Sequence, residues 1–257
     1  VVAALPAVAA VWLGIRGRWR CAFPLLALAV LVKPTAAAIG PLLLAAAARE
    51  GRAALFAAIQ GIGIALLLVV LAYVPFWAGP ETLAGLDRDD VFSASPAELV
   101  LHGLEAAGWP LDRAMVVAGG LASGLFGLLF LLVLLAVWRR ALSLPGAAAT
   151  AYLAYLLIGA QWFNPWYLLW LMPFATLAPE WPIRVVAVVF GLLAPLTYLL
   201  QYQAGPVVLL VFLPTLALVL YWRRSFGLSF GLLLTYSPLG TKHAVLQLPP
   251  TAALAEP

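Results

Sequence analysis

Two places in this apolar sequence hold side chains that could do chemistry. Lys33 is the one charged residue between positions 21 and 48. Gln161 and Asn164 interrupt an uncharged apolar stretch from 147 to 178. An ammonium can bind a phosphate as a point charge, and amides can hydrogen-bond hydroxyl groups. An ionisable group at membrane depth also suggests a functional site. The pattern therefore indicates a site for a polar or anionic ligand beside a membrane.

The composition fixes the class of protein that must position these residues. Apolar residues make up 65% of the 257 residues and charged residues 9%, which is far from an ordinary soluble domain. The apolar stretches are continuous runs of Leu, Ala and Val rather than alternating ones. We therefore expect an all-α fold, a polytopic transmembrane helical bundle with no large soluble domain. The single Cys21 excludes an internal disulfide, and His102 and His243 are too few for a metal centre.

The distribution of charge predicts the orientation. Basic residues lie at the ends of apolar stretches, at 16–20, 49–52, 139–140, 184 and 223–224. Such clusters mark the cytoplasmic side of a membrane, so the charge of +4 is no sign of nucleic-acid binding. The acidic stretch 79–113 is expected on the extracytoplasmic side. This alternation predicts about nine membrane segments within a transmembrane domain at 1–224, in the cell membrane, followed by a poorly ordered tail at 225–257.

Two of these membrane segments are expected to be broken hairpins. Basic clusters flank both ends of the apolar stretch 21–48. A single crossing would leave one of these clusters on the extracytoplasmic side, against the preference of basic clusters for the cytoplasmic side. Pro34 ends a helix, so the chain is predicted to turn at Lys33. Asn164-Pro165 is a turn-initiating pair of the same kind, among aromatic residues that favour the membrane–water interface. Both turns are predicted on the extracytoplasmic face.

The acidic stretch contains a further helix signal. Ser95 followed by Glu98 resembles a capping box. It predicts a short amphipathic helix that begins there and ends near Ala107. We expect this helix to lie along the outer surface.

Three motifs together resemble a known family of enzymes. They are Leu31-Val32-Lys33-Pro34-Thr35, Tyr73-Val74-Pro75-Phe76-Trp77 and Phe163-Asn164-Pro165-Trp166-Tyr167-Leu168-Leu169-Trp170. In this order, over roughly 21–178, they resemble the GT-C superfamily of integral-membrane glycosyltransferases. The likeness is greatest to the bacterial branch that takes mannose or a related sugar from a polyprenyl-phosphate carrier.

The resemblance implies an activity and its partners. It implies a polyprenyl-phosphate sugar donor, a lipid or glycan acceptor at the extracytoplasmic face, and inverting transfer without a nucleotide sugar or another cofactor. Enzymes of this family carry a catalytic Asp or Glu in a first extracytoplasmic loop. This sequence shows no such loop before the apolar stretch 1–15, so we expect either an N-terminally truncated chain that has lost the base with that loop, or a pseudo-enzyme that cannot catalyse.

Each candidate site residue also has a structural interpretation. Lys33 is expected to bind the donor phosphate, or else to extend to the interface as lysines in membrane proteins do. The side chains expected to bind substrate are Gln161, Trp162, Asn164, Trp166, Tyr167 and Trp170. The aromatic ones could instead be interfacial anchors, and the amides could instead stabilise the turn.

The catalytic base is not identified by the sequence. Asp89 and Asp90 are weak candidates for a base or for ligands of a divalent cation, and solvated loop charges are the alternative. A different class of function is a non-catalytic transporter or lipid-handling membrane protein. Broken helices with polar tips occur in transporters as well, where they lie near the bilayer centre rather than at one face.

Overall fold

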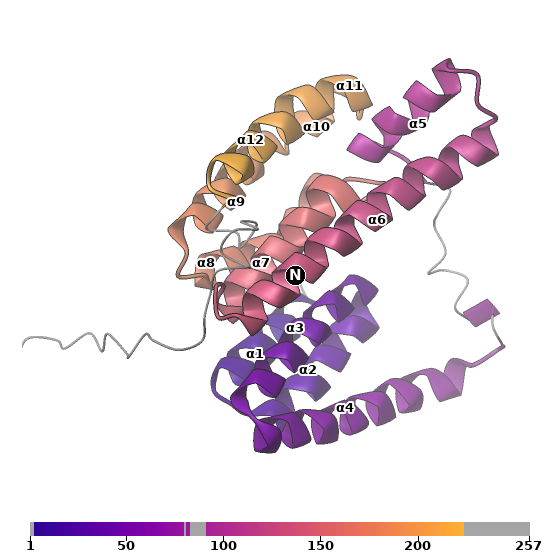
Figure 1. The fold of residues 1–257 in the computed structure, drawn as a ribbon. Helices are drawn as coiled ribbons and strands as arrows, with labels where there is room; N and C mark the ends of the chain where they lie inside the picture. The colour runs from indigo at the N-terminus through magenta and orange to yellow at the C-terminus, as the bar shows by residue number, and fades with distance from the viewer. Residues whose placement is uncertain (1–2, 80, 83–90, 224–257) are drawn as a thin grey trace, which may run out of the picture.

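The computed structural model describes residues 3–79, 81–82 and 91–223, and this part of the chain is an all-helical bundle (Figure 1). Its first four helices pack together at the lower side of Figure 1. They are α1 (Ala4–Ile15), α2 (Trp19–Val32), α3 (Ile39–Glu50) and α4 (Arg52–Tyr73). Helix α2 lies between α1 and α4 and contacts both along its length. Helix α4 is peripheral, with Ala58 and Gly61 as its buried residues.

The middle of the bundle is built on one long helix. The elements here are α5 (Pro96–Ala106), α6 (Leu111–Trp138), α7 (Leu144–Ala154) and α8 (Leu168–Leu177). Helix α7 is continued by a π-helical turn at Tyr155–Gly159. It packs between α6 and α8, and nearly all of its residues are buried. Helix α7 is therefore the centre of the core.

The last helices are α9 (Trp181–Leu193), α10 (Leu196–Leu199), α11 (Ala204–Val207) and α12 (Leu213–Tyr221). Of these, α9 packs against α8, and α12 packs against α9. A π-helical segment, Val208–Phe212, joins α11 to α12. Figure 1 shows this group in orange, with α9 beside α8 and α11 near α5.

Four helical stretches in the described part of the chain are long and apolar enough to cross a membrane. They are Arg52–Phe76, Leu111–Trp138, Trp181–Leu199 and Ala204–Tyr221. Shorter apolar helices are found at Ala4–Ile15, Trp19–Val32 and Leu144–Gly159. A transmembrane helix needs about 20 residues, and the short ones span part of that thickness. The all-α fold is confirmed, whereas the count of nine membrane segments is not.

Both predicted helix breaks are confirmed. Helix α2 ends at Val32, Lys33 is extended, and a 3-10 turn begins at Pro34. Asn164 is likewise extended and is followed by a 3-10 turn at Pro165–Tyr167. In each case the proline prevents the residue before it from being helical, because its ring clashes with that residue's backbone. The predicted tail at 225–257 lies outside the described residues.

Interactions between distant turns gather the basic clusters at one end of the bundle. The Trp19 indole N–H donates a hydrogen bond of 3.0 Å to the Glu50 carboxylate. The Arg49 guanidinium donates to the carbonyl oxygen of Val137. These contacts bring together the turns at 16–20, 49–52 and 137–140. We call this part of the molecule the basic end.

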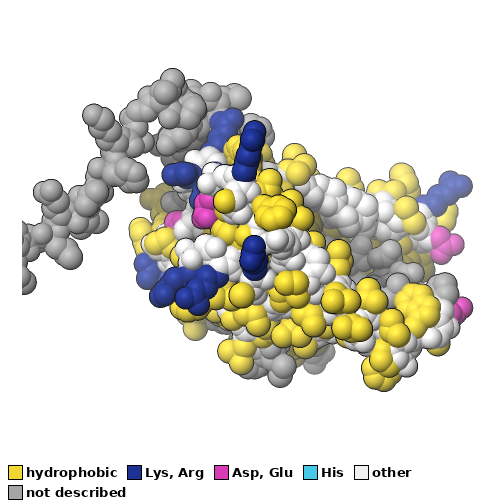
Figure 2. All heavy atoms as spheres, turned by 90° about the horizontal axis from the view of Figure 1, so that it is seen from below, with side chains coloured by type: hydrophobic (Ala, Val, Ile, Leu, Met, Phe, Trp, Pro, Cys, Tyr) yellow, Lys and Arg dark blue, Asp and Glu magenta, His cyan; other side chains and the backbone are white. Residues whose placement is uncertain are grey.

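Two more turns meet in the same way. The Ser143 backbone N–H and hydroxyl donate to the Glu180 carboxylate at 2.8 and 2.9 Å. The rings of Trp181 and Trp222 lie 5.2 Å apart, edge to face. One face of the molecule carries most of its visible Lys and Arg side chains at one side, with hydrophobic side chains along its length (Figure 2).

The opposite ends of the helices carry the polar turns. Ser93 donates its N–H to the Gln161 carbonyl at 3.1 Å, and the Tyr202 hydroxyl donates to Asn164 Oδ1 at 3.2 Å. These contacts join three of the turns found here. We call this the tip end, and it comprises the turns at 32–34, 91–95, 160–167 and 200–203.

Candidate functional site

Lys33 lies over a group of aromatic rings at the tip end. Its Nζ is 5.0 Å from the ring centroid of Trp170 and 5.7 Å from the centroids of Trp166 and Tyr167. A cation within about 6 Å of an aromatic face is attracted by the ring quadrupole, by roughly 0.5–2 kcal/mol depending on desolvation. The rings therefore fix the ammonium of Lys33 at a defined place. Lys33 itself is half-buried.

The three rings form one packed group. Tyr167 and Trp170 stack with centroids 4.5 Å apart, and Trp166 meets Tyr167 edge to face at 4.3 Å. Tyr167 and Trp170 are buried, at 6% and 8% exposure, while Trp166 is 46% exposed. The group thus has a fixed inner part and one ring at the surface.

Local sequence explains why these side chains converge. The 3-10 turn at Pro165–Tyr167 runs directly into α8. Residues three and four apart lie on the same face of a helix, so Trp170 lies beside Trp166 and Tyr167. The ring of Tyr152 on α7 packs beside this group, with its centroid 6.5 Å from that of Trp170.

Asn164 is held by a distant turn. It is 7% exposed, and its Oδ1 accepts the hydrogen bond from Tyr202. Partial desolvation, together with Tyr198, raises the pKa of the Tyr202 hydroxyl above its ordinary value. This contact supports the structural interpretation of Asn164 as a residue that stabilises the turn.

Gln161 connects the loop before α5 to the core. Its carbonyl accepts from the Ser95 hydroxyl at 2.5 Å as well as from Ser93. Its side chain packs on Gly119 of α6, where a Cβ would lie 2.6 Å from Gln161 Nε2. Gln161 therefore fastens the loop before α5 against α6, and its side chain is not part of the group around Lys33.

The predicted cap of α5 is confirmed with one difference. Ser95 Oγ accepts from the Glu98 N–H at 3.2 Å. The Glu98 carboxylate accepts from the Ala94 N–H at 2.5 Å, one residue before the partner that a capping box uses. Ala94 has a positive φ of 52°, which turns its N–H toward the helix.

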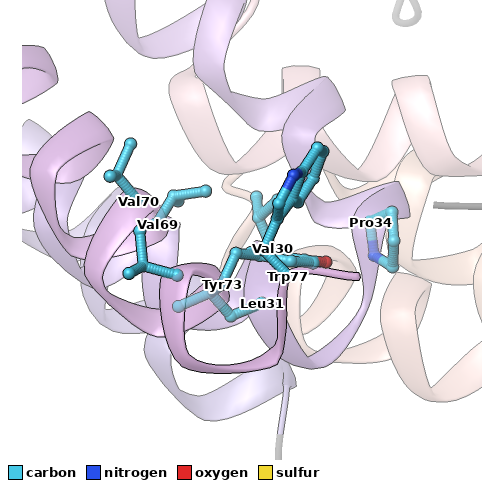
Figure 3. A pocket seen from close by; sticks show the side chains of 8 residues that line it. Val30, Leu31, Pro34, Val69, Val70, Tyr73 and Trp77 are labelled. Atoms are coloured by element: carbon cyan, nitrogen blue, oxygen red, sulfur yellow. The ribbon is translucent and has the colours of Figure 1, made fainter. Parts of the chain in front are cut away.

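An apolar groove lies at the end of α2, close in the chain to Lys33. It measures about 400 Å³ and lies between the end of α2 and the end of α4. Figure 3 shows the side chains that line it, which include Val30, Leu31, Pro34, Val69, Tyr73 and Trp77. Its volume falls in the range of small-molecule sites. Its lining includes Pro34, the residue after Lys33, whereas the Lys33 ammonium is directed toward the aromatic rings.

The space on the other side of Lys33 is small. A cavity of about 10 Å³ lies between Lys33, Thr35 and Trp170. This volume suffices for about one water molecule and not for a phosphate group. The exposed Trp166, whose ring centroid is 5.7 Å from Lys33 Nζ, marks the side from which an anion could approach the ammonium.

The structure brings together four of the predicted site residues: Lys33, Trp166, Tyr167 and Trp170. Trp162 touches the edge of this group, with its ring 6.1 Å from that of Tyr167. Gln161 and Asn164 direct their side chains to other partners. Asp89 and Asp90 lie outside the described residues.

Reasoning from the sequence missed two residues that hold the aromatic turn in place, Ser93 and Tyr202. Ser93 pairs with Trp162 as an isolated parallel β-bridge, which joins the loop before α5 to the aromatic turn. Tyr202 donates a hydrogen bond to Asn164. A contact between residues distant in the chain leaves no local signal in the sequence.

Comparison with known proteins does not identify a family for this chain. No protein-family model, no curated protein and no solved structure gives a significant match to the chain.

Proposed function

We propose that this chain is a glycosyltransferase of the GT-C type. It transfers a sugar, mannose or a related hexose, from a polyprenyl-phosphate carrier to a lipid or glycan acceptor at the extracytoplasmic face of the cell membrane. The basic end faces the cytoplasm, and the tip end faces the opposite compartment. The proposal rests on the motif resemblance and on one structural observation.

That observation is the position of the Lys33 ammonium over packed aromatic rings, at a break in the chain where its neighbour Pro34 lines an apolar groove. A polyprenyl phosphate has a strongly apolar chain and an anionic head. The groove between α2 and α4 offers a lining for the chain, and the ammonium of Lys33 offers a charge for the head. The exposed Trp166 is suited to stack on a sugar attached to that phosphate.

The chemistry follows from the charges that change during transfer. A hydroxyl oxygen of the acceptor forms a bond to the anomeric carbon, and the bond from that carbon to the phosphate oxygen breaks. Negative charge develops on the leaving phosphate, and a fixed ammonium stabilises it. The hydroxyl proton passes to a carboxylate. Asp89 and Asp90 remain the weak candidates for that carboxylate, and neither a metal nor another cofactor is required.

The test replaces the ammonium and measures transfer. Lys33→Ala in the full chain should lower transfer more than tenfold, which is about 1.4 kcal/mol of transition-state stabilisation or more. Lys33→Arg keeps the charge and should retain part of the activity. Activity of the alanine variant within tenfold of the wild type, with equal insertion into the membrane, would exclude Lys33 as the phosphate ligand.

A second candidate is a lipid-handling protein or transporter without catalytic activity. The observation in its favour is the small space beside Lys33, which leaves the groove as the larger site among the described residues. Such a protein would bind polyprenyl phosphate but transfer no sugar. Measuring binding and transfer on the same preparation separates the two functions.

A further inference from the structure

The basic end concentrates positive charge where three turns meet. Seven arginines lie there: Arg16, Arg18, Arg20, Arg49, Arg52, Arg139 and Arg140. The same turns contain one carboxylate, Glu50, and its Oε2 accepts the hydrogen bond from Trp19. In the described part of the chain, the ion pairs are those of His102 with Glu98 and Glu105, on α5. The charge of the arginines is therefore not neutralised by protein carboxylates in that part.

The arginine side chains are accessible. Arg16, Arg18, Arg20, Arg52 and Arg140 are exposed. Among the described residues, the close contacts of Arg16 include the ring of Trp12, with Cζ 4.6 Å from its centroid. Exposed aromatic rings border the cluster, with Trp12 at 46% and Trp138 at 53% exposure. Exposed tryptophans at the end of an apolar helix mark the level of lipid headgroups.

We infer that the basic end binds acidic phospholipids, with the guanidinium groups of the turns at 16–20, 49–52 and 139–140 holding the headgroup phosphates. Guanidinium groups pair with phosphate through two parallel hydrogen bonds. Basic pockets between helices at a membrane surface hold anionic headgroups by the same charge complementarity. The acyl chains lie against the apolar surface beside the cluster, where Figure 2 shows hydrophobic side chains next to dark blue ones.

This inference does not depend on sugar transfer, because it concerns the opposite end of the bundle from Lys33. It assigns the arginines a ligand in addition to their effect on orientation. A lipid site differs from an orientation signal in two respects. It discriminates acidic from zwitterionic headgroups, and it retains lipid after the membrane is removed.

The experiment counts lipids bound to the full chain in a neutral detergent by native mass spectrometry. The protein is titrated with phosphatidylglycerol, phosphatidylcholine or inorganic phosphate. We expect phosphatidylglycerol to bind and phosphatidylcholine to bind at least tenfold more weakly. Equal binding of the two lipids would overturn the inference. Binding of inorganic phosphate that displaces the acidic lipid completely would also overturn it, because the site would then be a free-anion site.

The variants locate the site. Each arginine near an anionic surface contributes about a fivefold affinity, equivalent to about 1 kcal/mol. Arg18→Gln with Arg20→Gln should therefore weaken phosphatidylglycerol binding roughly 25-fold. Arg18→Lys with Arg20→Lys keeps the charge but loses the two parallel hydrogen bonds, and should weaken binding less than the glutamine pair does. Arg113→Gln, an exposed arginine on α6 beyond the tip end, should have no effect. Undiminished binding by the double glutamine variant would contradict the assignment.

Discussion

The Lys33 ammonium lies 5.0 Å from the ring centroid of Trp170, so the break after α2 and the start of α8 meet at one place. A charged lysine at the edge of a bilayer is costly unless it is paired or reaches the interface. Here the aromatic group lowers that cost by cation–π attraction, and the groove at the end of α2 is lined by apolar side chains that include Pro34, the residue after Lys33. The two breaks thus bring a cation onto an aromatic group, within a few residues of a surface suited to a lipid chain.

Within the aromatic group, Trp170 is predicted to have a structural role and Trp166 a binding role. Trp170→Ala should destabilise the protein by about 3 kcal/mol or more, because it removes a buried ring. Trp166→Ala should cost less than about 1 kcal/mol, because that ring is 46% exposed, and should still lower transfer. Thermal unfolding in detergent, combined with a transfer assay, checks both. Equal losses of stability in the two variants would contradict the packing described here.

The attachment of α5 depends on one hydroxyl. Ser95→Ala removes the cap of α5 and the hydrogen bond to the Gln161 carbonyl, and should cost about 1–2 kcal/mol. Hydrogen exchange of the α5 amides should then become faster. Ser93→Ala is the matched control, since the Ser93 hydrogen bonds are made by its backbone. Faster exchange in the control as well would show that the Ser95 side chain is not the fastening group.

The surroundings of two glycines in the bundle predict opposite effects on stability when each is replaced by alanine. At Gly146 a Cβ would lie 2.5 Å from Glu180 Oε2, inside the network that the carboxylate forms with Ser143. Gly146→Ala should therefore lower the free energy of unfolding by about 1–3 kcal/mol. At Gly124 on α6 no atom lies within 4 Å, so Gly124→Ala should be neutral or stabilising by up to about 1 kcal/mol. Parallel unfolding curves measure both, and a neutral Gly146→Ala would exclude a tight contact there.

The proposed orientation can be tested by labelling cysteines in intact cells. In a Cys21→Ser background, Gln203→Cys places an exposed thiol at the tip end and Arg140→Cys places one at the basic end. A membrane-impermeant maleimide should label Gln203→Cys from outside. Arg140→Cys should react only after the membrane is opened. The reverse labelling pattern would show that the tip end is cytoplasmic.

The sequence predicted those parts of the fold that depend on neighbouring residues. Pro34 and Pro165 act on the residue before them, so both breaks could be located from the sequence. The meeting of Lys33 with Tyr167 could be expected because both were assigned to one face. The count of membrane segments could not be confirmed, because apolar composition alone does not distinguish a short packed helix from a span.

Contacts between distant residues explain what the sequence did not predict. The hydrogen bond from Tyr202 to Asn164 joins two turns that are 38 residues apart in the chain, so it has no local sequence signal. The carbonyl of Gln161 is a backbone group, and no sequence pattern predicts that the Ser95 hydroxyl donates to it. For both amide residues, the structure supplies a partner within the protein that the sequence could not identify.

Binding of a polyprenyl phosphate to the purified full chain tests the central claim most directly. The account predicts that Lys33→Gln weakens this binding at least tenfold, while a polyprenol without phosphate binds the variant and the wild type equally. Equal affinity of the two proteins for the phosphate would contradict the assignment of Lys33 as the group that holds the carrier.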